Sequence, residues 1–201
     1  MLETSPAIRL PLPEEFPGNQ LLIRELEKRK NAKIVEGYVL HYNTTHDLPF
    51  TFYAEININN SRFWKLFTGL VNLLPNEVSC IYNLYGHEPN YSPYLGKNEI
   101  LDFLEKFKLE LTQDCNLEFG LIFQTGDKLE EIFAAETKYI KVWSSKEVLF
   151  RQLMLAFNLE EMPGLNFIDE FPKAVMELTS INTDAKDTAL VIGEMKKYFN
   201  G

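Results

Sequence analysis

The chain has 201 residues, of which 45% are hydrophobic and 24% are charged. These values are typical of a globular domain and exclude a disordered, collagen-like or coiled-coil chain. A chain of this length buries about 70% of its unfolded surface, so it needs neither disulfides nor a structural metal to fold. Its 29 acidic and 20 basic side chains give a net charge of −9, which repels phosphate backbones and argues against nucleic acid as a partner.

The two cysteines, Cys80 and Cys115, belong to no CxxC motif or Cys/His cluster, so their spacing predicts no zinc site. We expect both to be free thiols of a cytoplasmic protein, because small secreted domains usually carry more cysteines. Residues 1–19 lack the basic segment and apolar stretch of a signal peptide. No stretch approaches the ~18 apolar residues of a membrane span, so we expect no membrane association.

Residues 1–18 hold four of the ten prolines, with apolar residues such as Ile8 and Leu10 between them. Proline lacks an N–H and fixes φ, so this segment is neither a regular helix nor a central strand. The pattern predicts a proline-rich extended N-terminal arm along the body, with a frayed terminus as the alternative. No repeat and no Gly/Ser linker divides the remainder, so residues 19–201 are expected to form a single domain.

A helix and a hairpin are predicted to follow the arm. Apolar residues at helical spacing indicate a short helix over residues 20–30. Residues 34–42 and 50–58 are rich in β-branched and aromatic side chains and predict a hairpin with a longer loop. In residues 50–58 apolar and polar residues alternate, which is typical of a strand with one core face.

The next predicted elements are a helix, a strand and a long loop. Asn60 or Ser61 is expected to cap a helix that ends near Leu74. Residues 78–85 predict a strand. The loop of residues 86–96 follows, with two prolines and two tyrosines in eleven residues.

The clearest helix is predicted over residues 97–111, where apolar residues mark one face and charged residues fall elsewhere. The apolar face consists of Ile100, Phe103, Leu104, Phe107 and Leu111.

Residues 117–123 predict a short apolar strand, and residues 129–134 and 139–143 a second hairpin. The sequence from Ser144 to Glu147 fits an S-x-x-E capping box that opens a further helix.

Thr183 or Asp184 is expected to cap a last helix that runs through Phe199. Because some strands are paired in hairpins and others lie singly between helices, we predict the α+β class. The fold is expected to have a largely antiparallel or mixed sheet with helices packed mostly on one face.

No motif for nucleotide binding, serine hydrolysis, metalloprotease chemistry or calcium binding is present. The spacing of His41 and His46 does not direct two imidazoles at one metal, and we expect no metal and no cofactor. Catalysis is the alternative to binding: a hydrolase-type site assembled in space from His87 and a carboxylate such as Glu88 or Asp169.

The loop of residues 86–96 is the best candidate for a protein-binding surface. Tyrosine offers a large contact area with little entropy to lose, and the prolines limit the entropy of the free loop. The alternative is that these rings pack on the domain and only order a long loop. The candidate protein-binding residues are Tyr85, His87, Glu88, Tyr91 and Tyr94.

Residues 101–201 carry 18 acidic and 11 basic side chains, against 11 and 9 in residues 1–100. Clustered acidic side chains accelerate encounter with a basic protein, whereas the alternative is that they only keep the protein soluble.

The absence of catalytic motifs, the tyrosine-rich loop and the acidic second half favour a cytosolic protein-binding protein without catalytic activity, such as a bacterial immunity protein that neutralises a toxin. A further alternative is a small-ligand module, with an apolar cavity between the sheet and the helix that contains Phe63. The oligomeric state stays open.

Overall fold

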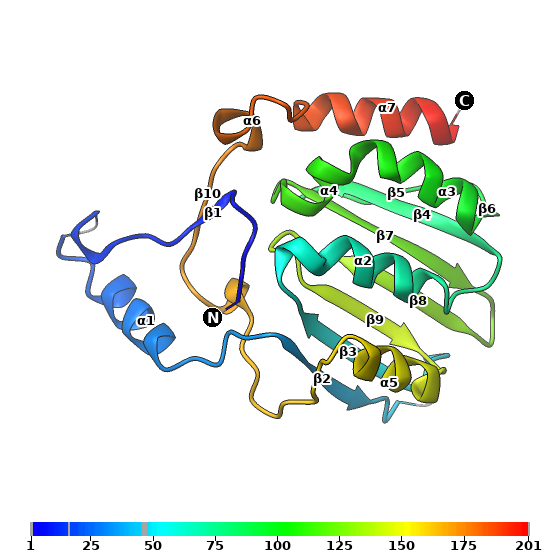
Figure 1. Ribbon diagram of the computed structural model, residues 1–201, viewed down its shortest axis with the longest axis horizontal. Coiled ribbons are helices and arrows are strands. Elements are labelled where there is room, and N and C mark those ends of the chain that lie inside the picture. The colour runs from blue at the N-terminus through cyan, green and yellow to red at the C-terminus, as the bar shows by residue number, and fades with distance from the viewer. Residues whose placement is uncertain (1, 16, 46–47, 201) are drawn as a thin grey trace.

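The computed structural model describes residues 2–15, 17–45 and 48–200 (Figure 1). His46 lies outside these ranges, as does residue 16 of the arm. The strands are β1 (Ile8–Arg9), β2 (Gly37–Tyr42), β3 (Phe52–Asn57), β4 (Glu77–Leu84), β5 (Asn90–Tyr91), β6 (Leu95–Gly96), β7 (Leu117–Gln124), β8 (Leu129–Ala134), β9 (Ile140–Ser144) and β10 (Ala174–Val175). The α-helices are α1 (Gln20–Lys30), α2 (Asn60–Val71), α3 (Lys97–Leu104), α4 (Lys108–Gln113), α5 (Glu147–Ala156), α6 (Leu178–Ile181) and α7 (Thr188–Asn200), and the 3₁₀ turns are η1 (Pro13–Glu15), η2 (Glu105–Phe107) and η3 (Ile168–Glu170).

One antiparallel sheet forms the centre of the structure. Its strands follow the order β2, β3, β9, β8, β7, β4 and β5, and β6 pairs with β4 beside β5. All of these pairings are antiparallel. The predicted α+β class with a largely antiparallel sheet is confirmed, as are the two predicted hairpins, which are β2–β3 and β8–β9.

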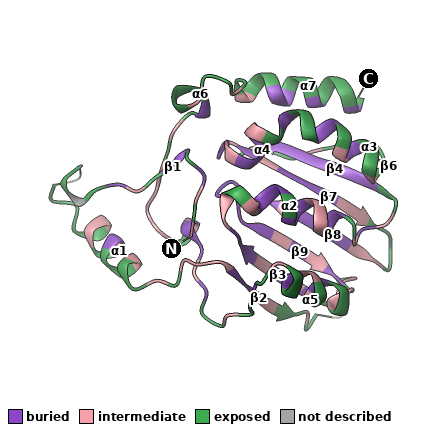
Figure 2. Ribbon diagram, in the orientation of Figure 1, coloured by how far each residue is buried: buried purple, intermediate pink, exposed green. Residues whose placement is uncertain are grey.

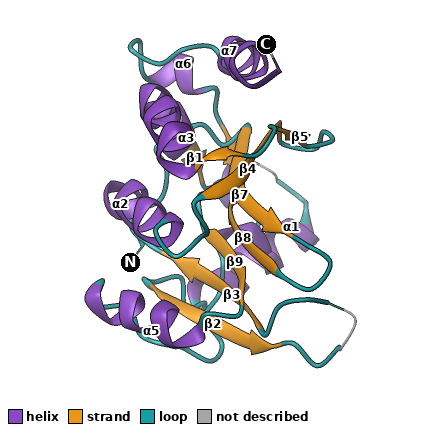
Figure 3. Ribbon diagram, turned by 90° about the vertical axis from the view of Figure 1, so that its right-hand side faces the viewer, coloured by secondary structure: helices purple, strands orange, loops and turns teal. Residues whose placement is uncertain are grey.

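The helices pack mostly on one face of this sheet, as predicted. Figure 3 shows α2, α3 and α5 on the same side of the strands, and α7 at the β4 end of the sheet. There Phe199 of α7 packs on Tyr82 of β4, with ring centroids 5.5 Å apart. Figure 1 places α1 and the N-terminal arm beyond one end of the sheet rather than over it. At that end the opposite face is covered by Leu165 and Phe167, which pack with Tyr139. In the described chain, the rest of this opposite face carries no helix.

The main core lies between the helices and the sheet (Figure 2). Phe63 and Phe67 of α2 are fully buried, and the ring centroids of Phe67 and Phe119 are 4.7 Å apart. On β3 the predicted core face is buried, including Phe52 and Ile56. Burying one large apolar side chain stabilises the fold by roughly 1.5–3 kcal/mol. The apolar stripe of α2 therefore holds this helix on the sheet.

The helix predicted over residues 97–111 is interrupted. All five of its predicted apolar residues are buried, but the turn η2 separates α3 from α4. Phe107 leaves the helical region with φ −117° and ψ 17°. At the break, the Trp64 indole N–H donates a hydrogen bond to the Glu105 carboxylate. Periodicity located the buried face correctly because a short change of pitch hardly alters which residues face the core.

Helix α2 begins with Asn59 as N-cap rather than with Asn60 or Ser61. The Asn59 side chain does not cap its own helix but accepts a hydrogen bond from the Glu3 backbone N–H, at 2.8 Å. The Glu3 carboxylate in turn accepts a 2.6 Å hydrogen bond from the Ser61 hydroxyl. The N-terminal arm thus contacts the start of α2. The local sequence pattern cannot predict a contact between residues that are 56 positions apart.

The capping box predicted from Ser144 to Glu147 is not formed. The Ser144 hydroxyl donates a hydrogen bond to the buried Glu130 carboxylate and accepts one from the Lys146 N–H, at 3.0 Å. Glu147 instead pairs with Arg151 one turn along α5, at 2.7 Å. Cross-strand contact with β8 therefore takes the serine away from the helix terminus.

The last helix, α7, begins at Thr188, later than predicted. The Asp187 carboxylate accepts hydrogen bonds from the N–H groups of Ala189 and Leu190, at 2.9 and 3.3 Å. Asp187 is therefore the capping residue, in place of Thr183 or Asp184.

The N-terminal arm is tied to the last third of the chain. β1 pairs with β10, with Ile8 opposite Val175. Ala7 is fully buried and belongs to a small cluster with Ile8, Cys115 and Ile168. This cluster is separate from the main core, which gives the arm its own contacts with the body.

Candidate binding surfaces

The loop of residues 86–96 runs along an edge of the sheet. It contains the two-residue strands β5 and β6, both paired with β4, which are too short to be seen in the sequence pattern. Tyr91 lies opposite Ile81 in this pairing. The Ser92 hydroxyl accepts a 2.8 Å hydrogen bond from the Cys80 N–H. These bonds fix the backbone of the loop beside β4.

The tyrosines of this region point largely to solvent. Tyr85, Tyr91 and Tyr94 keep 56%, 54% and 46% of their surface exposed. The Tyr94 hydroxyl donates a 3.1 Å hydrogen bond to the Gln124 carbonyl and accepts a 2.9 Å bond from the Gln124 N–H. Exposed rings on a fixed backbone suit a binding surface.

His87 and Glu88 are both exposed at the end of β4. His87 lines a shallow depression of about 320 Å³ together with Glu177 and Asp187. The Asp187 carboxylate already caps α7, and no hydrogen bond in the described chain joins the His87 imidazole to a carboxylate. In many acid–base sites a carboxylate orients the imidazole through such a hydrogen bond.

Asp169, the other candidate carboxylate, lies in η3. It accepts a 3.1 Å hydrogen bond from the Tyr139 hydroxyl and does not line the depression that contains His87.

Residues 102–136 carry nine acidic and three basic side chains, but these acidic side chains form no continuous surface. Asp102, Glu105 and Asp127 are exposed. The buried members of the stretch are Glu110, Asp114, Glu130 and Glu136. Two of these hold the start of α7 and the segment before it. Glu110 accepts a 2.7 Å hydrogen bond from the Lys186 N–H, and Asp114 accepts one of 2.5 Å from the Thr188 hydroxyl. Much of the acidity thus has a structural use.

The side of the sheet opposite the helices, here called the uncovered face, carries two rows of side chains. Strand register fixes which residues share a row, because alternate residues point to the same face. One row runs across the strands through His41, Tyr53, Trp143, Glu131, Ile122 and Ser79. The next runs through Val39, Glu55, Lys141, Phe133, Gly120, Ile81 and Tyr91. Tyr91 is one of the predicted protein-binding residues, so the second row joins the predicted tyrosine region (residues 85–94) to this face.

Aromatic rings pack on one another along the uncovered face. The ring centroids of Tyr53 and Trp143 are 4.8 Å apart, and those of His41 and Tyr53 are 6.3 Å apart. Phe133 lies directly opposite Gly120, whose missing Cβ leaves room for its ring. The result is a half-buried aromatic surface with defined geometry.

Glu131 lies in the middle of this surface, between Trp143 and Ile122 in the register. It is half-buried and forms no ion pair with the described residues. Burial raises the pKa of the Glu131 carboxyl from 4.5 to about 7. A carboxylate among aromatic and aliphatic side chains loses hydration, and here no cation compensates for that loss. Binding of a partner that places a cationic side chain beside it is therefore favoured.

Other carboxylates share this setting. In the described chain Glu55, Glu118 and Asp169 likewise form no ion pair within 4 Å. Glu118 accepts a 2.7 Å hydrogen bond from the Asn83 amide. The one lysine in the two rows, Lys141, places its Nζ 5.1 Å from the centre of the Tyr139 ring. The uncovered face therefore carries an excess of negative charge.

No pattern in the sequence singles out Glu131 as a site residue. Alternation within residues 129–134 is imperfect, since Glu130 and Glu131 are adjacent and only one of them can face the helices. Glu130 is the buried one, held by the Ser144 hydroxyl. The pairing of β8 with β9 was predicted, but its register was not, and the register is what places Glu131 beside Trp143.

None of the described helices is long and apolar enough to span a membrane. In residues 2–15, 17–45 and 48–200, no group of three or more His, Cys, Asp or Glu side chains is arranged to hold a metal ion. Comparisons with known protein families, with curated proteins and with solved structures give no match. Any function must therefore be argued from the surfaces themselves.

Proposed function

We propose that this protein acts by binding a basic protein, without catalysis, and that the uncovered face is its main contact surface. An immunity protein that neutralises a toxin is one concrete form of such a binder. The observation that carries the proposal is Glu131, a half-buried carboxylate that has no cation among the described residues and lies beside the Trp143 and Tyr53 rings.

Two properties of this surface support protein binding. Tyrosine and tryptophan dominate the binding energy of many interfaces, because they bury a large area at a small entropic cost. Antiparallel sheets can leave one face to solvent, but a surface of this kind usually presents charged and polar residues rather than adjacent aromatic rings. Tyr53, Trp143 and Phe133 are only half-buried here because no described helix lies over them.

The charge of the face supports a basic partner. Glu131 loses part of its hydration when the protein folds. A lysine or arginine of the partner can therefore pair with it at a smaller further cost of desolvation. Glu55 and Glu118 add negative charge on the same face. Complementary charge also speeds encounter, and this gain decreases with ionic strength.

The predicted tyrosine region extends the proposed surface toward the edge of the sheet. Tyr91 lies in the same cross-strand row as Phe133. Tyr85, His87, Glu88 and Tyr94 border it at the β4 edge and stay candidate contact residues. We expect their contribution to be smaller than that of Glu131, because exposed rim contacts usually contribute less binding energy than desolvated central ones.

The proposal is tested by quantitative affinity capture from a native lysate, with identification of the retained proteins and titration of the purified partner by calorimetry. Wild-type protein should retain one basic protein in stoichiometric amount. Glu131→Lys should weaken that complex by about tenfold or more, because it places two cations together. Trp143→Ala should weaken it as well.

The matched control is Asp102→Lys, the same type of charge reversal at an exposed position of α3. It should leave the affinity within about twofold. Failure to retain any stoichiometric protein, or equal loss of affinity in the Asp102 and Glu131 variants, contradicts the proposal. Self-association through this face would appear in sedimentation as a dimer that Trp143→Ala dissociates, and that result also contradicts a basic partner.

A further inference from the structure

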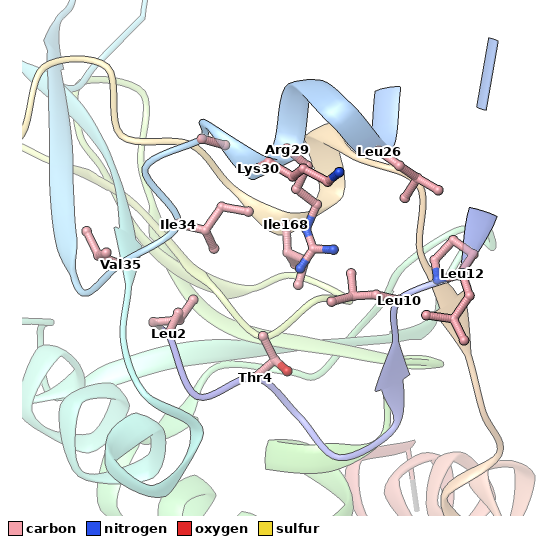
Figure 4. A pocket seen from close by; sticks show the side chains of 12 residues that line it. Leu2, Thr4, Leu10, Leu12, Leu26, Arg29, Lys30, Ile34, Val35 and Ile168 are labelled. Atoms are coloured by element: carbon pink, nitrogen blue, oxygen red, sulfur yellow. The ribbon is translucent and has the colours of Figure 1, made fainter. Parts of the chain in front are cut away.

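A cavity of about 580 Å³ lies between the N-terminal arm, α1 and the segment that leads into β2 (Figure 4). It is independent of the uncovered face. Its lining includes Thr4 and Leu10 of the arm, Arg29 and Lys30 of α1, and Ala32 and Ile168. The volume lies within the range of about 300–1,000 Å³ that is usual for small-molecule sites.

The cavity wall is apolar apart from one threonine and two cations. No acidic residue lines it, and neither Arg29 nor Lys30 forms an ion pair with a described residue. Figure 4 shows the Arg29 side chain extending from α1 toward Ile168 and Leu10. A guanidinium in such a place has no counter-charge of its own.

Arg29 is also incompletely hydrogen-bonded. Its Nε is buried and has no hydrogen-bond partner in the described chain. A buried polar group without a hydrogen-bond partner destabilises the fold, and more so when it is charged, so such groups are rare. The loss of hydration lowers the pKa of the guanidinium. A bound oxyanion would supply both the missing counter-charge and the missing hydrogen-bond acceptor, since arginine binds carboxylates through paired, charge-assisted hydrogen bonds.

We infer that this cavity binds a single-chain amphiphile with a carboxylate head, of the fatty-acid type, whose head pairs with Arg29 while its chain contacts the leucine and isoleucine walls. Apolar walls with two cations select against short polar anions, because these would leave the walls unfilled. They select against cationic and uncharged amphiphiles as well, because these would leave the guanidinium unpaired. The ligand would also join the arm to α1, since both line the cavity.

The experiment measures binding of decanoate below its micelle concentration to the full chain by calorimetry. We expect saturable binding of one decanoate per chain. Dodecanoate should bind about tenfold more tightly, since each buried methylene contributes ~0.8 kcal/mol. Decylamine and decanol should bind at least tenfold more weakly, and acetate should not bind measurably.

Variants assign the site. Arg29→Met keeps the length of the side chain and removes the charge, and it should weaken decanoate binding by about tenfold to a hundredfold. Arg24→Met, the same change at an exposed position of the same helix, should leave binding unchanged. Ala32→Trp should abolish binding by filling the cavity, and its circular dichroism spectrum should match that of the wild type.

A second readout uses the arm. Decanoate should slow tryptic cleavage after Arg9, which lies in β1, and it should not do so in Arg29→Met. Equal binding of decanoate and decylamine, an unaffected Arg29 variant, or no saturable binding of decanoate overturns the inference. So does capture by anionic lipid vesicles without binding of free decanoate, which would indicate a membrane surface instead.

Discussion

Replacing Glu131 by glutamine tests whether the uncovered face holds a carboxylate at an energetic cost. The pKa of this carboxyl is about 7 in the folded protein, against 4.5 for an ordinary glutamate. Each pKa unit corresponds to about 1.36 kcal/mol. The free-energy cost of burying the ionised Glu131 side chain is therefore at most about 3 kcal/mol. Because the side chain keeps some contact with water, screening reduces the expected cost to about 1–2 kcal/mol.

The sign follows from proton binding. Below a pH of about 4.5 the carboxyl is protonated in both states, and no penalty exists. Between about 4.5 and 7 the unfolded chain releases the proton while the folded protein keeps it, so the free energy of unfolding falls as the pH rises. Above a pH of about 7 both states are ionised and the full cost of burying the charge remains. Glutamine does not titrate, so its advantage over glutamate should grow across this window.

The assay is urea unfolding at pH values of about 4.5, 6 and 8. Glu131→Gln should gain about 1–2 kcal/mol in stability relative to the wild type between the lowest and highest pH. Glu55→Gln is the control: it makes the same change on the same face and measures how much the loss of another carboxylate alters the free energy of unfolding. Parallel stability curves for the wild type and the Glu131 variant would show that this carboxylate is not desolvated, and the reasoning about the face would be wrong.

Three further predictions concern the fold. Phe107→Ala should lower the free energy of unfolding by about 3–5 kcal/mol in urea titrations, because the ring is 1% exposed and its loss leaves a cavity; a loss below about 1 kcal/mol would mean that the ring is not in the core. Gly120→Ala should cost about 1–3 kcal/mol, since a Cβ there would lie 2.4 Å from the Ile132 carbonyl oxygen; an unchanged melting temperature would contradict the β7–β8 register. Asp187→Ala should cost about 1 kcal/mol through loss of the α7 cap, whereas Asp184→Ala should not, and equal effects of the two variants would contradict the assigned start of α7.

The sequence predicted elements whose signal is local and periodic. Alternation in residues 50–58 gave the core face of β3, and the apolar spacing in residues 97–111 gave the buried face of α3 and α4. In both cases burial dominates the energetics, and burial leaves a regular pattern in the sequence.

Features that depend on distant contacts were not predictable in this way. Ser144 has the sequence of a capping box, but the hydrogen bond to Glu130 on the neighbouring strand prevails. The N-cap Asn59 binds Glu3 of the arm. On the uncovered face, Glu131 and Trp143 become neighbours only through the register of β8 and β9. A one-residue slip in any pairing would place other side chains there.

The most direct test of the central claim uses Trp143 as a reporter of the uncovered face. In a Trp64→Phe background it is the only tryptophan, since the chain contains two. Acrylamide quenching of its fluorescence is then measured with and without the captured basic partner. We predict that the partner reduces quenching of Trp143 several-fold and that Glu131→Lys removes this protection at the same protein concentrations. A complex that forms while Trp143 stays as accessible as in the free protein would contradict the account.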